Sequence, residues 1–162
     1  MTQAKTDDTA VNPAIVVADG GFGVTLFRTL MPNAAGNIAI SPLSVSLALQ
    51  VLYNGAAGTT QQAMAQTLEL GRLSVQDMNA ANAALQASLL NADPLLDIII
   101  ANSLWTQGSA GTVAAAATTV GVTDSVAPAA TFTMTMNRPF LYAIVDGVTG
   151  ELIFLGALMN PS

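Results

Sequence analysis

Apolar residues in the first quarter of the chain follow a helical period. Phe22, Leu26 and Leu30 recur every fourth residue, which predicts an amphipathic helix that ends near Pro32. The polar residues 1–17 before it predict a disordered lead-in.

The next stretch predicts a strand followed by a buried central helix. Residues 37–40 read as a short buried strand, and residues 43–53 are apolar on nearly every side. Ser41 occupies an N-cap position, where its hydroxyl can accept a first-turn N–H, and Pro42 suits the first helical position. Gly55 is the expected C-terminal stop.

Two further helices and one strand are expected in the middle of the chain. Thr59 and Gln62 form a capping-box pattern that predicts a short helix through about Leu68. A third helix is expected over residues 75–91, and the isoleucine-rich residues 95–105 predict a strand.

The last third of the chain has a β pattern. Threonine alternates with apolar residues over 131–136, which predicts a half-buried strand. Residues 140–146 and 151–159 predict two antiparallel strands joined by the Gly-Val-Thr-Gly turn at 147–150. The expected fold class is α+β, with N-terminal helices packed on a small antiparallel sheet that the C-terminal hairpin largely forms.

Residues 111–122, Gly-Thr-Val-Ala-Ala-Ala-Ala-Thr-Thr-Val-Gly-Val, lack charged, aromatic and large aliphatic side chains other than valine. Four consecutive alanines favour a helix, whereas the β-branched residues after them favour extended backbone. Loop, helix and strand all remain open for this small-residue tract. Taken alone, it is typical of a flexible linker.

Composition and charge exclude several classes of function. The chain has 162 residues and a net charge of −6, and its four basic residues are scattered. Nucleic-acid binding needs clustered basic residues, so we exclude it. The longest apolar run, residues 43–53, is too short to span a membrane, so no membrane association is expected.

The residue inventory argues against catalysis. The chain contains no histidine and no cysteine, which removes the commonest general base and the thiol nucleophile. Its ten carboxylates show no metal-loop spacing. We therefore expect no catalytic residues, no metal site and no cofactor.

Five separated stretches, in the correct order, resemble the serpin family of serine protease inhibitors. They are residues 37–49 (Asn-Ile-Ala-Ile-Ser-Pro-Leu-Ser-Val-Ser-Leu-Ala-Leu), 55–60, 101–105 (Ala-Asn-Ser-Leu-Trp), 111–118, and the C-terminal block from Asn137-Arg138-Pro139-Phe140 to Asn160-Pro161. The resemblance covers most of residues 18–162, which are expected to form one shortened serpin-like domain.

The resemblance implies a reactive loop over residues 108–130. Its hinge corresponds to the small residues Gly111, Thr112, Ala114, Ala115, Ala116, Ala117 and Thr118. In the family such a hinge inserts into the large sheet after cleavage and traps the protease. Ser41 and Ser44 match serpin positions beneath the sheet opening, although helix capping alone would also explain them.

The scissile bond is bracketed by counting from both sides of the loop. The bracket contains Asp124, Ser125, Val126, Ala127, Pro128 and Ala129, with Ser125-Val126 favoured. No lysine or arginine lies between Arg72 and Arg138, so an elastase-like or subtilisin-like serine protease is the expected partner.

The chain departs from the family between Trp105 and Gly111. In serpins a long segment that carries most of the large sheet separates these motifs, so that sheet is expected to be mostly missing here. Two interpretations of the function remain. The first is protease inhibition through the loop, with trapping by strand insertion doubtful. The second is a non-inhibitory interaction module or an inactive deletion product. Exposed strand edges predict a homo-oligomer. No signal sequence is visible, and the resemblance suggests an extracellular protein, with a cytoplasmic one as the alternative.

Overall fold

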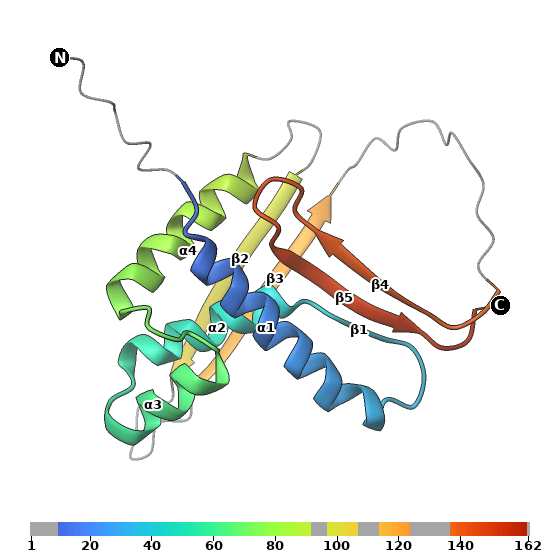
Figure 1. Ribbon diagram of the computed structural model, residues 1–162, viewed down its shortest axis with the longest axis horizontal. Helices are drawn as coiled ribbons and strands as arrows, with labels where there is room; N and C mark the ends of the chain where they lie inside the picture. Colours follow the sequence, from blue (N-terminus) through green and yellow to red (C-terminus); the bar gives the residue numbers. More distant parts are fainter. Residues whose placement is uncertain (1–9, 92–96, 107–113, 124–136, 162) are drawn as a thin grey trace.

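A computed structural model describes residues 10–91, 97–106, 114–123 and 137–161, with backbone alone for 97–106 and 114–123. Four helices, a 3₁₀ turn and five strands make up these residues (Figure 1). The α+β class expected from the sequence is confirmed. The strand expected at 131–136 lies outside the described residues.

Helix α1 (Pro13–Leu30) begins earlier than the sequence pattern predicted. Asn12 caps it by accepting the Ala14 N–H at 3.0 Å, and Pro13 occupies the first helical position. The last residues of the expected lead-in are therefore helical, and Ile15 among them is fully buried. A 3₁₀ turn (Met31–Asn33) follows the helix.

Residues 43–53 are not the longest apolar helical stretch of the chain, as the sequence analysis had assumed, because α1 and the turn after it are longer. By length and composition alone, Pro13–Asn33 could cross a membrane, although residues 43–53 could not. Within the described chain, however, α1 packs against α2 and β5 and buries the carboxyl group of Asp19. One face of α1 is therefore part of the core.

The central helix α2 (Pro42–Gly55) follows the short strand β1 (Ile38–Ile40), as predicted. Helices α3 (Gly58–Thr67) and α4 (Val75–Leu90) also form near the predicted positions. The capping box expected at Thr59 is wrong, because α3 begins at Gly58 and has no side-chain cap. Gly55 is the last residue of α2 rather than a left-handed stop beyond it.

Strands β1, β4 (Phe140–Val145) and β5 (Leu152–Leu158) form a three-stranded antiparallel sheet in the order β1-β5-β4. The β4–β5 hairpin turns at Asp146, whose Oδ2 accepts from the N–H and the hydroxyl of Thr149 at 2.7 and 2.6 Å. Asn37 closes the opposite end of the sheet, where its Oδ1 accepts the Met159 N–H at 2.8 Å.

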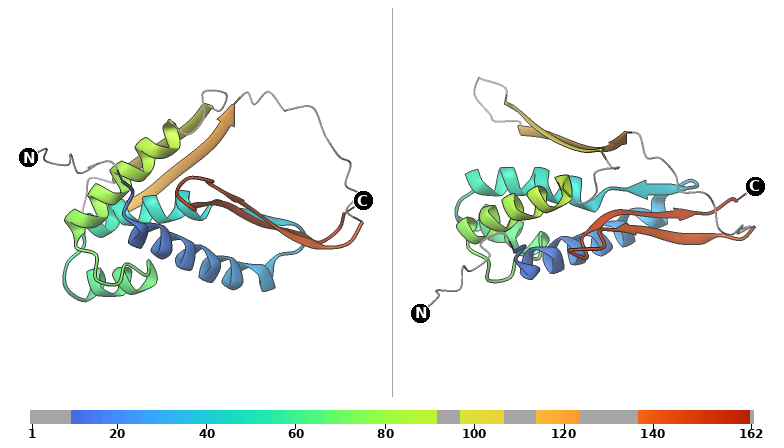
Figure 2. Two further views of the ribbon diagram at one scale, coloured as in Figure 1. Left: turned by 45° about the horizontal axis from the view of Figure 1, so that its top comes forward. Right: turned by 90° about the horizontal axis from the view of Figure 1, so that it is seen from above.

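A second sheet consists of two long strands, β2 (Asp97–Thr106) and β3 (Ala114–Thr123). Figure 2 shows this β2–β3 ribbon on one side of α2 and α4, with α1 and the hairpin on the other side. Both strands of the ribbon contact α2, and β2 also contacts α4. Helix α2 therefore lies between the two sheets.

The hydrophobic core joins α1, α2 and α4, and the partly buried Met64 and Ala65 of α3 pack against it. Its buried members come from α1, α2 and α4 and from the turn after α3: Ile15, Ala18, Phe22, Leu43, Leu47, Tyr53, Leu68, Leu70, Met78, Ala81, Leu85 and Leu89. Helix α4 contributes Met78, Ala81, Leu85 and Leu89 to this set. Helix α2 is at the centre of the molecule, as its apolar composition predicted.

Candidate functional site

The small-residue tract is a strand over most of its length. Strand β3 covers Ala114–Thr123 and pairs antiparallel with β2 over ten residue pairs. Loop, helix and strand were all open from the sequence. Pairing with β2 decides among them, because each strand supplies the hydrogen-bonding partners that the other needs.

The pairing gives positions to five of the seven hinge-like residues. The register runs from Ala114 opposite Thr106 through Ala115, Ala116 and Ala117 to Thr118 opposite Asn102. Gly111 and Thr112 lie outside the described residues, as does the whole scissile-bond bracket 124–129. The structure therefore describes most of the hinge-like segment and none of the expected bait.

Ser41 is the N-cap residue of α2, as predicted, and Ser44 lies beside it, but the Ser41 side chain makes no capping bond. The two Oγ atoms are 2.8 Å apart, and Ser41 donates to the backbone oxygen of Ile153 in β5 at 3.0 Å. Because Ser41 has one hydroxyl hydrogen, Ser44 is the donor in the serine pair. The expected N-cap bond at Ser41 is thus replaced by a link from the helix to the sheet.

A buried polar network joins three helices behind this end of α2. Oδ1 of Asp19 in α1 accepts from Ser46 at 2.5 Å and from Gln50 at 2.9 Å, and both donors belong to α2. Gln50 Nε2 also donates to Ser46 Oγ at 2.7 Å, and Asn82 of α4 donates to Gln50 Oε1. Asp19 and Ser46 are completely buried.

Two completely buried carboxyl groups, those of Asp19 and Glu151, lie near enough in this region for their charges to repel. Burial raises the pKa of Asp19 from 3.8 to about 6, against the lowering effect of the hydrogen bonds from Ser46 and Gln50. Burial also raises the pKa of Glu151, at the start of β5, from 4.5 to about 8, and the charges of Asp19 and Asp146 add to the increase. The Leu152 backbone N–H opposes the increase in the Glu151 pKa. It does not reach hydrogen-bond geometry with either carboxylate oxygen, so both oxygens lack a partner among the described residues.

The sequence analysis did not identify this network. One signal was available, an aspartate in an otherwise apolar helical stretch that begins with Asn12-Pro13. Its partners are 27 and 31 residues away in the chain, so no local spacing marks them. The network ties α1, α2 and α4 together through buried side chains.

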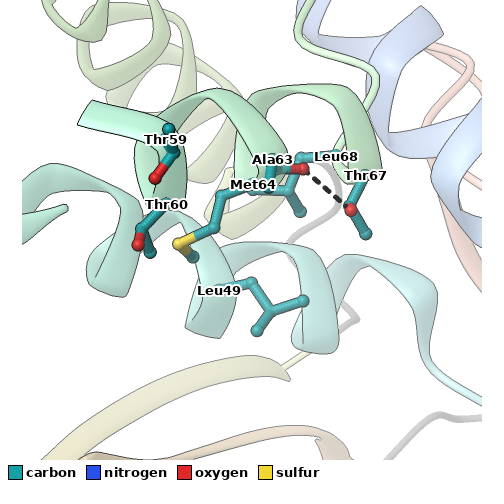
Figure 3. Close-up of a pocket in the computed structure, with 7 residues that line it drawn as sticks. All are labelled: Leu49, Thr59, Thr60, Ala63, Met64, Thr67 and Leu68. Carbon is teal, nitrogen blue, oxygen red and sulfur yellow. Dashed lines mark hydrogen bonds between the residues drawn. The ribbon is translucent and has the colours of Figure 1, made fainter. Parts of the chain in front are cut away.

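An apolar groove of about 510 Å³ lies between α2 and α3 (Figure 3). Its lining consists of Leu49, Thr59, Thr60, Ala63, Met64, Thr67 and Leu68. The groove contains no charged group, and its Thr67 hydroxyl already donates to the Ala63 backbone oxygen at 2.9 Å. It supplies apolar surface but no reactive chemistry.

Comparison with known proteins identifies the family of this chain. The family model described as Serpin (serine protease inhibitor) matches residues 18–110 and residues 108–161. The chain belongs to the serpin family. Serpins act generally as inhibitors and not as catalytic enzymes.

Individual serpins match over shorter stretches. Serpin B6 of Bos taurus is 43% identical over 61 residues, which cover 38% of this chain and 16% of that protein. Corticosteroid-binding globulin of Ovis aries is 34% identical over 115 residues, or 66% of this chain and 27% of that protein. Putative serpin-Z12 of Oryza sativa subsp. japonica is 41% identical over 51 residues, or 32% of this chain and 12% of that protein. The chain therefore spans a minor part of the length of these relatives.

Proposed function

We propose that the protein inhibits a serine protease by presenting residues 108–130 as a substrate-like reactive loop. The observation that carries the proposal is the strand β3, in which Ala114–Thr118 pair with β2. These are the residues that the serpin resemblance assigns to the hinge, and a serpin hinge must be able to become a strand. The loop and the remainder of residues 18–162 form one shortened serpin domain.

The composition of the loop defines the protease class. The bait lies within residues 124–129, and Ser125-Val126 is the favoured bond. A bond flanked by small or valine side chains suits a shallow apolar pocket, as in elastase-like and subtilisin-like proteases. Trypsin-like proteases are disfavoured because the loop contains no lysine or arginine.

Trapping by strand insertion is the part of the family mechanism that we do not carry over. The two family matches meet at residues 108–110, which supports the loss of the segment that holds most of the large sheet. In the described chain β3 is already paired, and β2 is its only partner. Cleavage then releases little additional pairing energy, so we propose reversible blocking of the protease instead of covalent trapping.

The experiment is incubation with pancreatic elastase and with subtilisin, followed by assay of residual activity before and after dilution. We expect inhibition that dilution reverses and no adduct that survives denaturing electrophoresis. A Ser125→Arg variant should shift recognition to trypsin. A matched Val148→Arg variant carries the same charge on a residue that is 78% exposed in the hairpin turn, and it should not do so. Rapid cleavage of the loop by a protease that keeps its full activity would contradict the inhibitor proposal.

A second candidate function is a non-inhibitory interaction module, or an inactive deletion product. The name of the ovine relative, corticosteroid-binding globulin, describes a binding protein and not an inhibitor. The exposed apolar edge strand β4 also favours an interaction role. Under either function we propose self-association through strand edges and an extracellular location, with the cytoplasm as the alternative.

A further inference from the structure

Strand β4 is an unpaired edge in the described part of the chain. It lies outermost in the order β1-β5-β4 (Figure 1). Five of its six residues are exposed. Leu141 is 65% exposed and Ile144 is 52% exposed. The strand itself carries no charge, although soluble proteins commonly protect such an edge with charged residues or proline.

The hairpin fixes which backbone groups face outward. Asp146 donates its N–H to the Glu151 backbone oxygen at 2.9 Å, so its backbone is directed toward β5. The β4–β5 register shifts between Ile144 and Val145, where Ile153 is an extra residue on β5 and β4 itself is continuous. Backbone direction therefore alternates along β4 as in a regular antiparallel strand. The N–H and C=O groups of Leu141, Ala143 and Val145 are therefore directed toward the free edge.

This alternation limits how a second copy of the chain can pair with β4. In an antiparallel pair of identical strands, each outward-directed residue must face another outward-directed residue. The two-fold axis must then pass beside one residue and not between two. A centre at Ile144 would set Phe140 and Leu141 against the hairpin turn at 147–148, which is not extended. Leu141, Tyr142 and Ala143 are therefore the possible centres.

Charge selects one of these three registers. With Tyr142 at the centre, Arg138 of each copy faces Asp146 of the other copy, so the two-fold symmetry creates two such charge pairs. With Leu141 at the centre, Arg138 faces Ile144. With Ala143 at the centre, it faces Val148 and Asp146 faces Phe140. The Asp146 side chain uses Oδ2 for its bonds to Thr149, so Oδ1 is the atom that would accept from Arg138.

We propose that two copies of the chain associate through antiparallel β4–β4 pairing centred on Tyr142, which forms a continuous six-stranded sheet. The register places Leu141 opposite Ala143 as hydrogen-bonded pairs and Tyr142 opposite Tyr142 as the close, non-hydrogen-bonded pair. Phe140 and Ile144 flank the tyrosine pair on the same face. This inference rests on the proposed self-association and specifies its strand and its register.

The dimer is weak, because one short strand pair buries less than the ~1,200 Å² typical of stable complexes. Sedimentation velocity over a concentration series is therefore the first measurement. We expect a concentration-dependent monomer–dimer equilibrium in the micromolar range. An Arg138→Glu variant places like charges together at both ends and should weaken the dimer by about fivefold or more. A Val17→Glu variant on the exposed side of α1 carries an added negative charge away from β4 and should leave the dimer unchanged.

Single cysteines test the register, because the chain has none of its own. Non-hydrogen-bonded pairs have Cα atoms about 4.5 Å apart, within the range that a disulfide spans. Under mild oxidation, Tyr142→Cys should form a covalent dimer, whereas Leu141→Cys and Ala143→Cys should not, since neither faces its own copy.

The outcomes separate the levels of the proposal. Dimers that cross-link equally at all three positions, or best at Leu141 or Ala143, overturn the register. A chain that stays monomeric at the highest concentration overturns self-association as well. If the cysteine variants fail to fold, the comparison of Arg138→Glu with Val17→Glu decides. Protease inhibition is measured separately and does not depend on any of these results.

Discussion

Ser46 donates its hydroxyl hydrogen to Oδ1 of Asp19 at 2.5 Å, and both side chains are completely buried. The bond joins α2 to α1 across the interior, where water cannot replace either partner. Gln50 shares the same acceptor oxygen, so each of the three groups depends on the other two. A buried network of this kind is costly when it is incomplete.

Replacement of Ser46 with alanine should therefore destabilise the fold. The Ser46→Ala variant removes one donor to Asp19 and one acceptor for Gln50, at an expected cost of about 1–3 kcal/mol in the free energy of unfolding. Urea denaturation followed by circular dichroism measures the change. Ser88→Ala on the half-buried side of α4 is the control and should change the free energy by less than about 0.5 kcal/mol. Equal effects at the two positions would contradict a special role for the network.

The two raised carboxyl pKa values make stability depend on pH in an unusual direction. Asp19 titrates at about 6 in the folded state instead of 3.8, and Glu151 at about 8 instead of 4.5. Between its unfolded-state and its folded-state pKa, each group binds more protons in the folded state than in the unfolded state. The free energy of unfolding therefore falls as pH rises from about 4 to about 8. We expect a loss on the order of a few kcal/mol from about pH 4 to pH 8. Denaturation midpoints at one-unit pH steps measure it.

The Glu151→Gln variant isolates the larger of these two effects. An amide cannot ionise, so the decline in stability between about pH 4.5 and pH 8 should flatten, and the variant should exceed the parent at pH 8. Glu69→Gln is the matched control, because Glu69 is exposed and accepts one hydrogen bond from Thr25 at 3.2 Å, which glutamine can also accept. Unchanged pH dependence in Glu151→Gln would show that this carboxyl group is not the source of the slope.

Asn37 fastens β1 to the end of β5, and its replacement should loosen that end of the sheet. Its Oδ1 accepts from the N–H groups of Met159 and Asn160 at 2.8 and 3.3 Å. The Asn37→Ala variant should lose about 0.5–1.5 kcal/mol, because the residue is exposed and water can partly replace it. Hydrogen exchange at the Met159 amide should accelerate more than global unfolding explains. Asn33→Ala, at an exposed site in the preceding turn, should not accelerate it.

Local patterns predicted those elements whose determinants are local. The helix at Val75–Leu90 and the hairpin strands β4 and β5 follow from periodicity and turn residues. The role of Ser41 did not follow, because the competing acceptor, Ile153 O, is 112 residues away in the chain. The strand state of Ala114–Thr123 likewise depends on pairing with β2, since its alanines favour a helix.

Two glycines in α1 should respond to the same substitution with opposite signs. At Gly20 an added Cβ would meet nothing within 4 Å, so Gly20→Ala should stabilise the protein by about 0.5–1 kcal/mol through helix propensity. At Gly23 the added Cβ would lie 2.6 Å from Cβ of Pro42, whose ring cannot rotate away. Gly23→Ala should therefore force α1 away from the start of α2 and destabilise the fold by about 1–3 kcal/mol. Paired thermal and urea unfolding of the two variants measures the difference. If both variants were stabilised, the close approach of α1 and α2 at Gly23 would be wrong, and with it the packing that holds Asp19 beside Ser46.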